Sequence, residues 1–265
     1  MSIYEFRPIL IYSVILAFCL GACMGSFLNC AAWRITHGES FIRGRSHCPF
    51  CGHELGLVEL IPVFGWLILK GRCRHCREKI SVRYLLTEII FGAITVMCLL
   101  RFDLTVLCLR NYIFLCILFL LTLTDIEDMI IPDGCHVAAL LVWVAAEPFL
   151  FAGWKDVGFS ILSLVIFGGG LLAISLVMDR ILGRDSLGGG DIKLFGVVGL
   201  YLGLIGTQFT VVLACAAGLV FHLFSGGRKE EGQAFPFGPW IAGAAAVMLL
   251  YGAPLVSWYL GLLGL

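Results

Sequence analysis

Apolar stretches of about 20 residues recur along almost the whole chain, and they restrict the fold more than any other feature. A helix of about 20 residues crosses the hydrocarbon core of a bilayer. Only 14% of the residues are charged and 60% are hydrophobic, whereas soluble domains are about 25% charged. Lipid offers the backbone no hydrogen-bond partners, and the pattern shows no strand-like alternation. The sequence therefore predicts an all-α polytopic membrane protein with about eight transmembrane helices.

The predicted spans lie near residues 9–33, 84–101, 105–125, 133–152, 157–179, 191–204, 206–224 and 238–260. The sixth is short and meets the seventh at an uncharged junction, so seven spans remain an alternative. Lys and Arg are concentrated in residues 34–83, with others at 180–193 and at Arg228 and Lys229. Basic loops usually face the cytosol, which places these segments on the cytosolic side of the membrane. The net charge is zero, which gives no support for a nucleic-acid partner.

Residues 34–83 form the only long hydrophilic segment, and this segment contains two Cys-x-x-Cys pairs. The four thiols belong to Cys48, Cys51, Cys73 and Cys76. Two such pairs typically hold one tetrahedral zinc ion, and four thiolates leave no open coordination site, so the metal would be structural. Disulfides, free thiols or thiol–disulfide exchange are the alternatives, and a reducing cytosol disfavours disulfides. We expect a first transmembrane helix (1–33), a cytosolic zinc-knuckle domain (34–83) and a transmembrane core (84–265).

Two carboxylates, Asp125 and Asp191, stand at the predicted cytosolic ends of apolar spans. A carboxylate inside a membrane segment is costly and is a functional hypothesis by default. Two close carboxylates share a proton, and this supplies one acid and one base for peptide hydrolysis. The alternatives are helix caps or an ion path, as in a proton-coupled transporter with a structural zinc domain.

The residues around Asp191 suggest a place for a peptide substrate. Gly188 and Gly190 permit backbone conformations that are closed to other residues, so an extended substrate strand could lie against them. Lys193 follows in the same segment. Because Asp191 begins a helix and Asp125 ends one, we expect Asp191 to act as the base and Asp125 as the acid.

Several motifs together resemble the type IV prepilin peptidases, which are intramembrane aspartic proteases of the G-x-G-D kind. "GGGD" (Gly188 to Asp191) is similar to the second catalytic motif of that family, and the segment from Asp125 to Asp133 is similar to the first. The other similar segments, in chain order, are "GSFLN" (25–29), the paired cysteines, "ELIPVFGW" (59–66), "RYLLTE" (83–88) and "FPFGP" (235–239).

The resemblance implies an aspartic endopeptidase of the bacterial cytoplasmic (inner) membrane. Such an enzyme removes the short basic leader of prepilin or pseudopilin precursors at the cytosolic face, while the apolar helix of the precursor stays in the lipid bilayer. Many members also methylate the new N-terminus with S-adenosylmethionine. The resemblance makes Asp125 and Asp191 the catalytic pair, with zinc as a structural cofactor and S-adenosylmethionine as the methyl donor.

Overall fold

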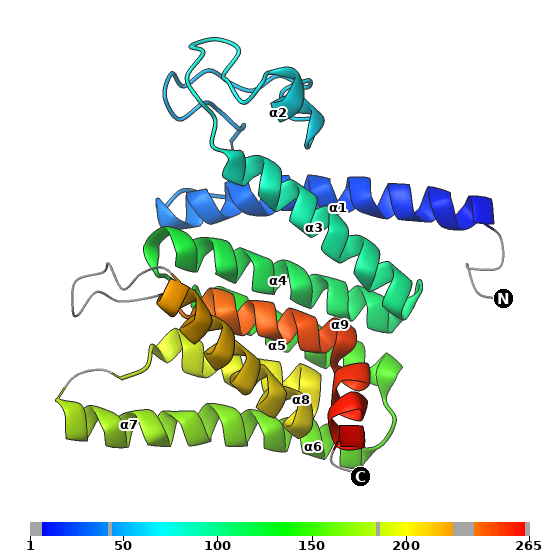
Figure 1. The fold of residues 1–265 in the computed structure, drawn as a ribbon, viewed down its shortest axis with the longest axis vertical. Helices are drawn as coiled ribbons and strands as arrows, with labels where there is room; N and C mark the ends of the chain where they lie inside the picture. The colour runs from blue at the N-terminus through cyan, green and yellow to red at the C-terminus, as the bar shows by residue number, and fades with distance from the viewer. Residues whose placement is uncertain (1–6, 42–43, 184–185, 225–235, 263–265) are drawn as a thin grey trace. The chain divides into compact units, whose positions relative to one another are not determined.

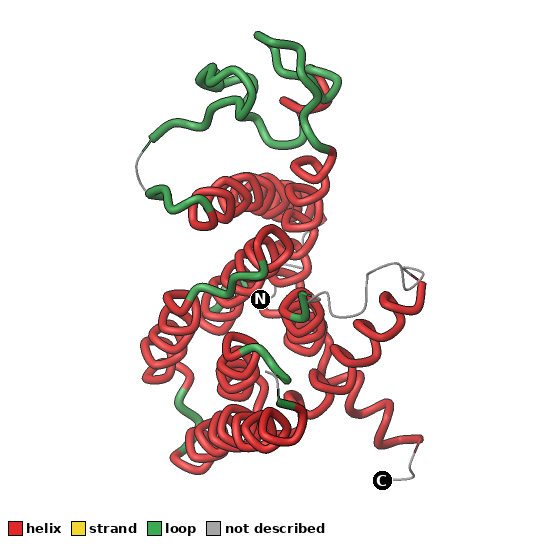
Figure 2. Tube along the Cα trace, turned by 90° about the vertical axis from the view of Figure 1, so that its left-hand side faces the viewer, coloured by secondary structure: helices red, strands yellow, loops and turns green. Residues whose placement is uncertain are grey.

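The structure is a computed structural model that describes residues 7–41, 44–183, 186–224 and 236–262. Arg228, Lys229 and Phe235, which entered the sequence predictions, lie outside these ranges. Within them the regular structure is helical, apart from two isolated β-bridges (Figure 1, Figure 2). The helices are α1 (Arg7–Thr36), α2 (Phe64–Ile68), α3 (Val82–Phe102), α4 (Val106–Asp128), α5 (Asp133–Leu150), α6 (Trp154–Leu164), η2 (Val165–Gly169), α7 (Gly170–Leu182), α8 (Gly189–Phe224) and α9 (Gly238–Leu262).

Seven helices in the described part of the chain are long and apolar enough to cross a membrane. The predicted all-α polytopic class is confirmed, with seven candidate spans where about eight were expected. The difference lies in α8, whose 36 residues comprise two helical segments that meet at a kink, close to the predicted junction of the stretches 191–204 and 206–224. A straight helix of that length would measure about 54 Å, well beyond the ~30 Å of hydrocarbon. Gly203 interrupts it with non-helical backbone, at φ 66° and ψ −174°.

The chain divides into two compact units, residues 1–108 and 109–265. In the first, α1 packs against α3 through small residues that let the two backbones approach closely. A Cβ atom placed on Gly25 would lie 3.0 Å from the carbonyl oxygen of Thr87. One placed on Gly92 would lie 2.8 Å from the ring of Phe18. These glycines therefore set the spacing of the helix pair that carries the hydrophilic loop.

In the second unit, α8 packs against α9, α6 and α5. The rings of Phe114 and Tyr201 stack with centroids 3.7 Å apart. The Tyr201 hydroxyl donates a buried hydrogen bond of 2.8 Å to the carbonyl of Ala139 on α5. A Cβ atom on Gly199 would lie 2.9 Å from the backbone of Ser163, so α6 and α8 also approach closely. This packing fixes the N-terminal end of α8, where Asp191 lies.

Candidate functional site

Asp125 lies in the last turn of α4, which continues to Asp128, three residues beyond the predicted end of this span. Its side chain is buried, with 4% of the residue exposed. The backbone N–H of Gly238, the first residue of α9, donates a hydrogen bond of 3.0 Å to Oδ2 of Asp125. A Cβ atom on Gly238 would lie only 2.8 Å from that oxygen. The start of α9 therefore holds the Asp125 carboxylate in a single orientation.

Asp191 lies in the first turn of α8 and is half-buried. Its Oδ1 atom is buried and has no hydrogen-bond partner among the described residues. Gly190, which precedes Asp191, and Gly238, which is bonded to Asp125, both lie against Ile131, so the two carboxylates lie in the same region of the second unit. Packing within the second unit thus brings together two acidic side chains that are far apart in the sequence, one of them with an unpaired oxygen.

Ile131, in the connection between α4 and α5, lies against the glycines beside both carboxylates. A Cβ atom on Gly190 would lie 2.9 Å from Cβ of Ile131, and one on Gly238 would lie 3.2 Å from its Cδ1. A Cβ atom on Gly188 would lie 3.0 Å from Oδ2 of Asp191. Neither Gly188 nor Gly190 has a positive φ. The absence of a side chain therefore matters here for space, and the backbone conformation is one that other residues can also adopt.

Lys193 pairs with a carboxylate of another helix. Its Nζ lies 2.6 Å from Oδ1 of Asp133, and both side chains are largely exposed. This pair joins the first turn of α8 to the first turn of α5. His136 lies one turn further along α5, is 7% exposed and has its Nδ1 4.0 Å from the same Asp133 oxygen. His136 was not among the residues predicted from the sequence, although an ionisable residue within a predicted span could have drawn attention to it.

The four cysteines of the hydrophilic loop come together as one cluster. Their Sγ atoms all lie within 4.8 Å of one another, and those of Cys48 and Cys76 are 3.9 Å apart. Tetrahedral zinc–sulfur bonds of about 2.3 Å require sulfurs about 3.8 Å apart, so the donor set fits zinc. Each pair sits in a tight turn closed by a bridge, His47 to Glu54 in one and Arg72 to Lys79 in the other. All twelve cysteines of the chain are described and none is in a disulfide.

The clustered thiols do not ionise independently. Hydrogen bonding from the Cys76 backbone lowers the pKa of the Cys73 thiol to about 7. At Cys76, which is exposed, hydrogen bonding from the Glu78 backbone is outweighed by partial desolvation and by the three neighbouring thiols, and the pKa rises to about 12. In the metal-free cluster, ionisation of one thiol thus disfavours ionisation of its neighbours, whereas a bound cation would stabilise all four thiolates.

Most of the chain is similar in sequence to known proteins. Residues 19–102 match the bacterial peptidase A24 N-terminal domain, and residues 112–223 match the type IV leader peptidase family. A "Prepilin leader peptidase/N-methyltransferase" of Bacillus subtilis (strain 168) is 31% identical over 247 residues, which cover 92% of this chain and 96% of that protein.

Proteins of the same description occur in two further organisms. The one from Myxococcus xanthus (strain DK1622) is 33% identical over 234 residues, 83% of this chain and 68% of that protein. The one from Dichelobacter nodosus is 30% identical over 234 residues, 84% of this chain and 80% of that protein. No solved structure matches the chain at a significant level.

Proposed function

This chain belongs to the type IV leader peptidase family, and on that premise we propose that Asp125 and Asp191 are the catalytic pair of a prepilin leader peptidase. The protein is a bifunctional enzyme that removes the leader peptide of prepilins and N-methylates the product. The transporter alternative finds no support among its relatives. The observation that carries the assignment of the site is that two carboxylates from separate family motifs lie in one region of the second unit, next to glycines that both contact Ile131.

In this mechanism the two carboxylates divide acid and base work. The Gly238 N–H bond fixes one oxygen of Asp125, while the unpaired, buried Oδ1 of Asp191 is available to a water molecule. Asp191 takes a proton from that water, which attacks the scissile carbonyl carbon. Asp125 donates its proton to the carbonyl oxygen, which gives a tetrahedral intermediate. Asp191 then passes its proton to the amide nitrogen and Asp125 takes its own proton back, while the carbon–nitrogen bond breaks and releases the leader and the new N-terminal amine. In the structure a helix N-terminus lies beside each carboxylate, α8 at Asp191 and α9 at Asp125, so the helix dipole does not distinguish the two roles.

The substrate approaches the pair from the membrane edge. The enzyme is a multi-pass inner-membrane protein, and the concentration of Lys and Arg in residues 34–83 favours a cytosolic position for the loop. The precursor then keeps its apolar helix in the bilayer, while its basic leader meets the carboxylates. Gly188, Gly190 and Lys193 form the surface that faces the leader, and the two glycines let Ile131 and the Asp191 carboxylate lie close against the backbone there.

We assign the two cofactors, zinc and S-adenosylmethionine, to the hydrophilic loop. Cys48, Cys51, Cys73 and Cys76 would hold one zinc ion, which stabilises a segment with few buried apolar residues. S-adenosylmethionine, as the usual donor for N-methylation, would supply the methyl group. We therefore propose three parts: a first helix (1–33), a zinc-knuckle domain (34–83) that holds the metal, and a transmembrane core (84–265) that contains the catalytic pair.

Substitution of the two carboxylates tests the proposed site. We expect Asp125→Asn and Asp191→Asn each to abolish leader removal from a co-expressed prepilin, read as a mobility shift on a gel. Asp156→Asn, in the first turn of α6, is the matched control and should cleave like the wild type. Normal cleavage by either of the first two variants, at equal expression, would show that the pair is not the catalytic centre.

A further inference from the structure

The hydrophilic loop contains an apolar segment, residues 57–69, whose large side chains are mostly exposed. Its sequence is "LVELIPVFGWLIL", with Glu59 as the one charged residue. Leu57 is 85% exposed, and Phe64 and Ile68 are each 62% exposed. The other large apolar side chains exposed here are Val58, Leu60, Ile61 and Leu67. An exposed apolar surface of this size marks a contact with another molecule or with a membrane.

The attachment of this segment to α3 sets its depth relative to the membrane. With 21 residues, α3 measures about 32 Å, which is close to the ~30 Å of the hydrocarbon core. The helix needs its whole length to cross, so its first residue, Val82, lies at the membrane surface. The Val63 N–H donates a hydrogen bond of 2.6 Å to Oε2 of Glu88, six residues into α3. This bond holds Val63 about 9 Å inside the surface.

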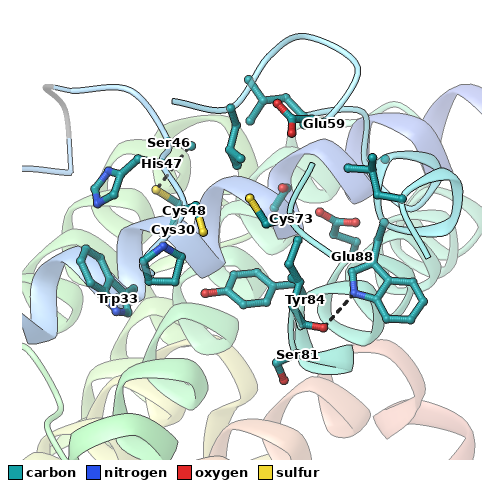
Figure 3. Close-up of a pocket in the computed structure, with 18 of the residues that line it drawn as sticks. Cys30, Trp33, Ser46, His47, Cys48, Glu59, Cys73, Ser81, Tyr84 and Glu88 are labelled. Atoms are coloured by element: carbon teal, nitrogen blue, oxygen red, sulfur yellow. Dashed lines mark hydrogen bonds between the residues drawn. The ribbon is translucent and has the colours of Figure 1, made fainter. Parts of the chain in front are cut away.

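Contacts with α1 agree with this depth. A Cβ atom on Gly25 would lie 3.2 Å from Cα of Glu88, so these two residues are at the same level. Cys30, five residues further along α1, is then near the membrane surface. Figure 3 shows Cys30 beneath the loop, where its Sγ lies 3.9 Å from Oγ of Ser46. The loop therefore reaches the membrane surface at Ser46 and passes below it at Val63.

A basic stretch, residues 70–79, follows the apolar segment and is fixed to it by hydrogen bonds. The Gly71 N–H donates to the Trp66 carbonyl at 2.9 Å. The indole N–H of Trp66 donates to the Ile80 carbonyl at 3.3 Å. The stretch has one acidic residue, Glu78, and five exposed basic residues, which are Lys70, Arg72, Arg74, Arg77 and Lys79. Lys and Arg close to a membrane surface are attracted by anionic lipid headgroups.

We propose that residues 57–69 lie in the interfacial layer of the membrane, with their exposed side chains among the acyl chains, and that the basic stretch binds the headgroups of anionic lipids. Interfacial segments bury their apolar face about 5–10 Å deep and carry Lys and Arg at the headgroup level, which matches the depth of Val63. In the orientation proposed above, this leaflet is the cytosolic one, which contains anionic lipids. The contact keeps the cysteine cluster at the membrane surface.

Photo-crosslinking tests the lipid contact in the full, zinc-loaded protein in lipid nanodiscs. The photo-reactive analogue p-azidophenylalanine at position 64 should form phospholipid adducts, which mass spectrometry detects. The same analogue at position 41 is the matched control, because Phe41 is also exposed. Phe41 follows Ser40, whose carbonyl accepts a hydrogen bond of 3.3 Å from Arg34, four residues beyond Cys30 and so outside the membrane surface. Position 41 should give at least about fivefold fewer lipid adducts.

Nanodiscs with equal amounts of phosphatidylglycerol and phosphatidylcholine test the headgroup contact. Adducts at position 64 should favour the anionic lipid about fivefold. The double variant Lys70→Gln/Arg74→Gln should bring the two adducts close to equal amounts. Arg101→Gln, which removes an exposed charge at the opposite end of α3, should leave the ratio unchanged. Zinc content shows that each variant keeps its loop folded.

Three results would overturn the proposal. Equal adduct yields at positions 64 and 41 would show that residues 57–69 do not lie in the membrane. A cross-link from position 64 to a second chain, seen as a dimer on a gel in place of lipid adducts, would show that a protein covers this surface. A lipid ratio that stays the same in the double variant would show that the basic stretch does not bind the headgroups.

Discussion

The backbone N–H of Gly238 donates a hydrogen bond of 3.0 Å to Oδ2 of Asp125, although 113 residues separate the two. This bond connects the last motif of the sequence with the first proposed catalytic carboxylate. Because the donor is a backbone group at the start of a helix, its position is set by the packing of α9 against α8. Gly238 is therefore a positioning residue for Asp125.

Gly238→Ala should reduce leader cleavage about tenfold or more, because its Cβ atom would lie 2.8 Å from Oδ2 of Asp125 and displace that carboxylate. The initial rate of cleavage of a purified prepilin provides the measurement. Gly243→Ala, in the same helix with open space around it, should stay within about twofold of the wild type. Equal rates for the two variants would contradict the positioning role.

The pair of Lys193 and Asp133 predicts a coupled effect on cleavage. Both side chains are exposed, so each alanine variant should lower the cleavage rate no more than about fivefold. The double variant should be no slower than either single one, because the two act through one ion pair. If Lys193 acts directly on Asp191, Lys193→Ala will instead shift the acidic limb of the pH–rate profile while Asp133→Ala leaves it in place.

Zinc removal should unfold the hydrophilic loop. Cys48→Ser, or treatment of the wild type with a strong chelator, should reduce zinc from about one ion per chain to a trace and expose residues 37–81 to protease. Elemental analysis and limited proteolysis measure the two effects. Cys215→Ser, an exposed thiol on α8 outside the cluster, should keep both zinc and protease resistance. Full zinc content in Cys48→Ser would show that the cluster is not the metal site.

The close packing of α1 and α3 predicts a loss of stability in the first unit. Gly92→Leu should lower the free energy of unfolding by about 1–3 kcal/mol, because its side chain would overlap the ring of Phe18. Thermal unfolding in detergent, followed by tryptophan fluorescence, measures the change. Ile90→Leu, on an exposed face of α3, should leave the midpoint almost unchanged. A midpoint for Gly92→Leu equal to that of the wild type would show that the two helices have room to separate.

Several features could be predicted from the sequence because they depend on local constraints. Lipid forces each apolar stretch to satisfy its own backbone hydrogen bonds, so length and composition predicted the helices to within a few residues. The break in α8 lies within three residues of the predicted junction between the stretches 191–204 and 206–224, although only the backbone angles show that it occurs at Gly203. The spacing of Cys48, Cys51, Cys73 and Cys76 predicted a cluster because each pair closes its own turn.

By itself the sequence determined the helical membrane class, the cysteine cluster and the two carboxylates at the ends of spans. Only the tertiary structure decided which distant groups contact the predicted site residues: Gly238 contacts Asp125, and Asp133 pairs with Lys193. The physical reason is that these contacts join segments distant in the chain. A residue's own motif carries no information on its distant partner, whereas helix packing fixes where each backbone group and charge lies.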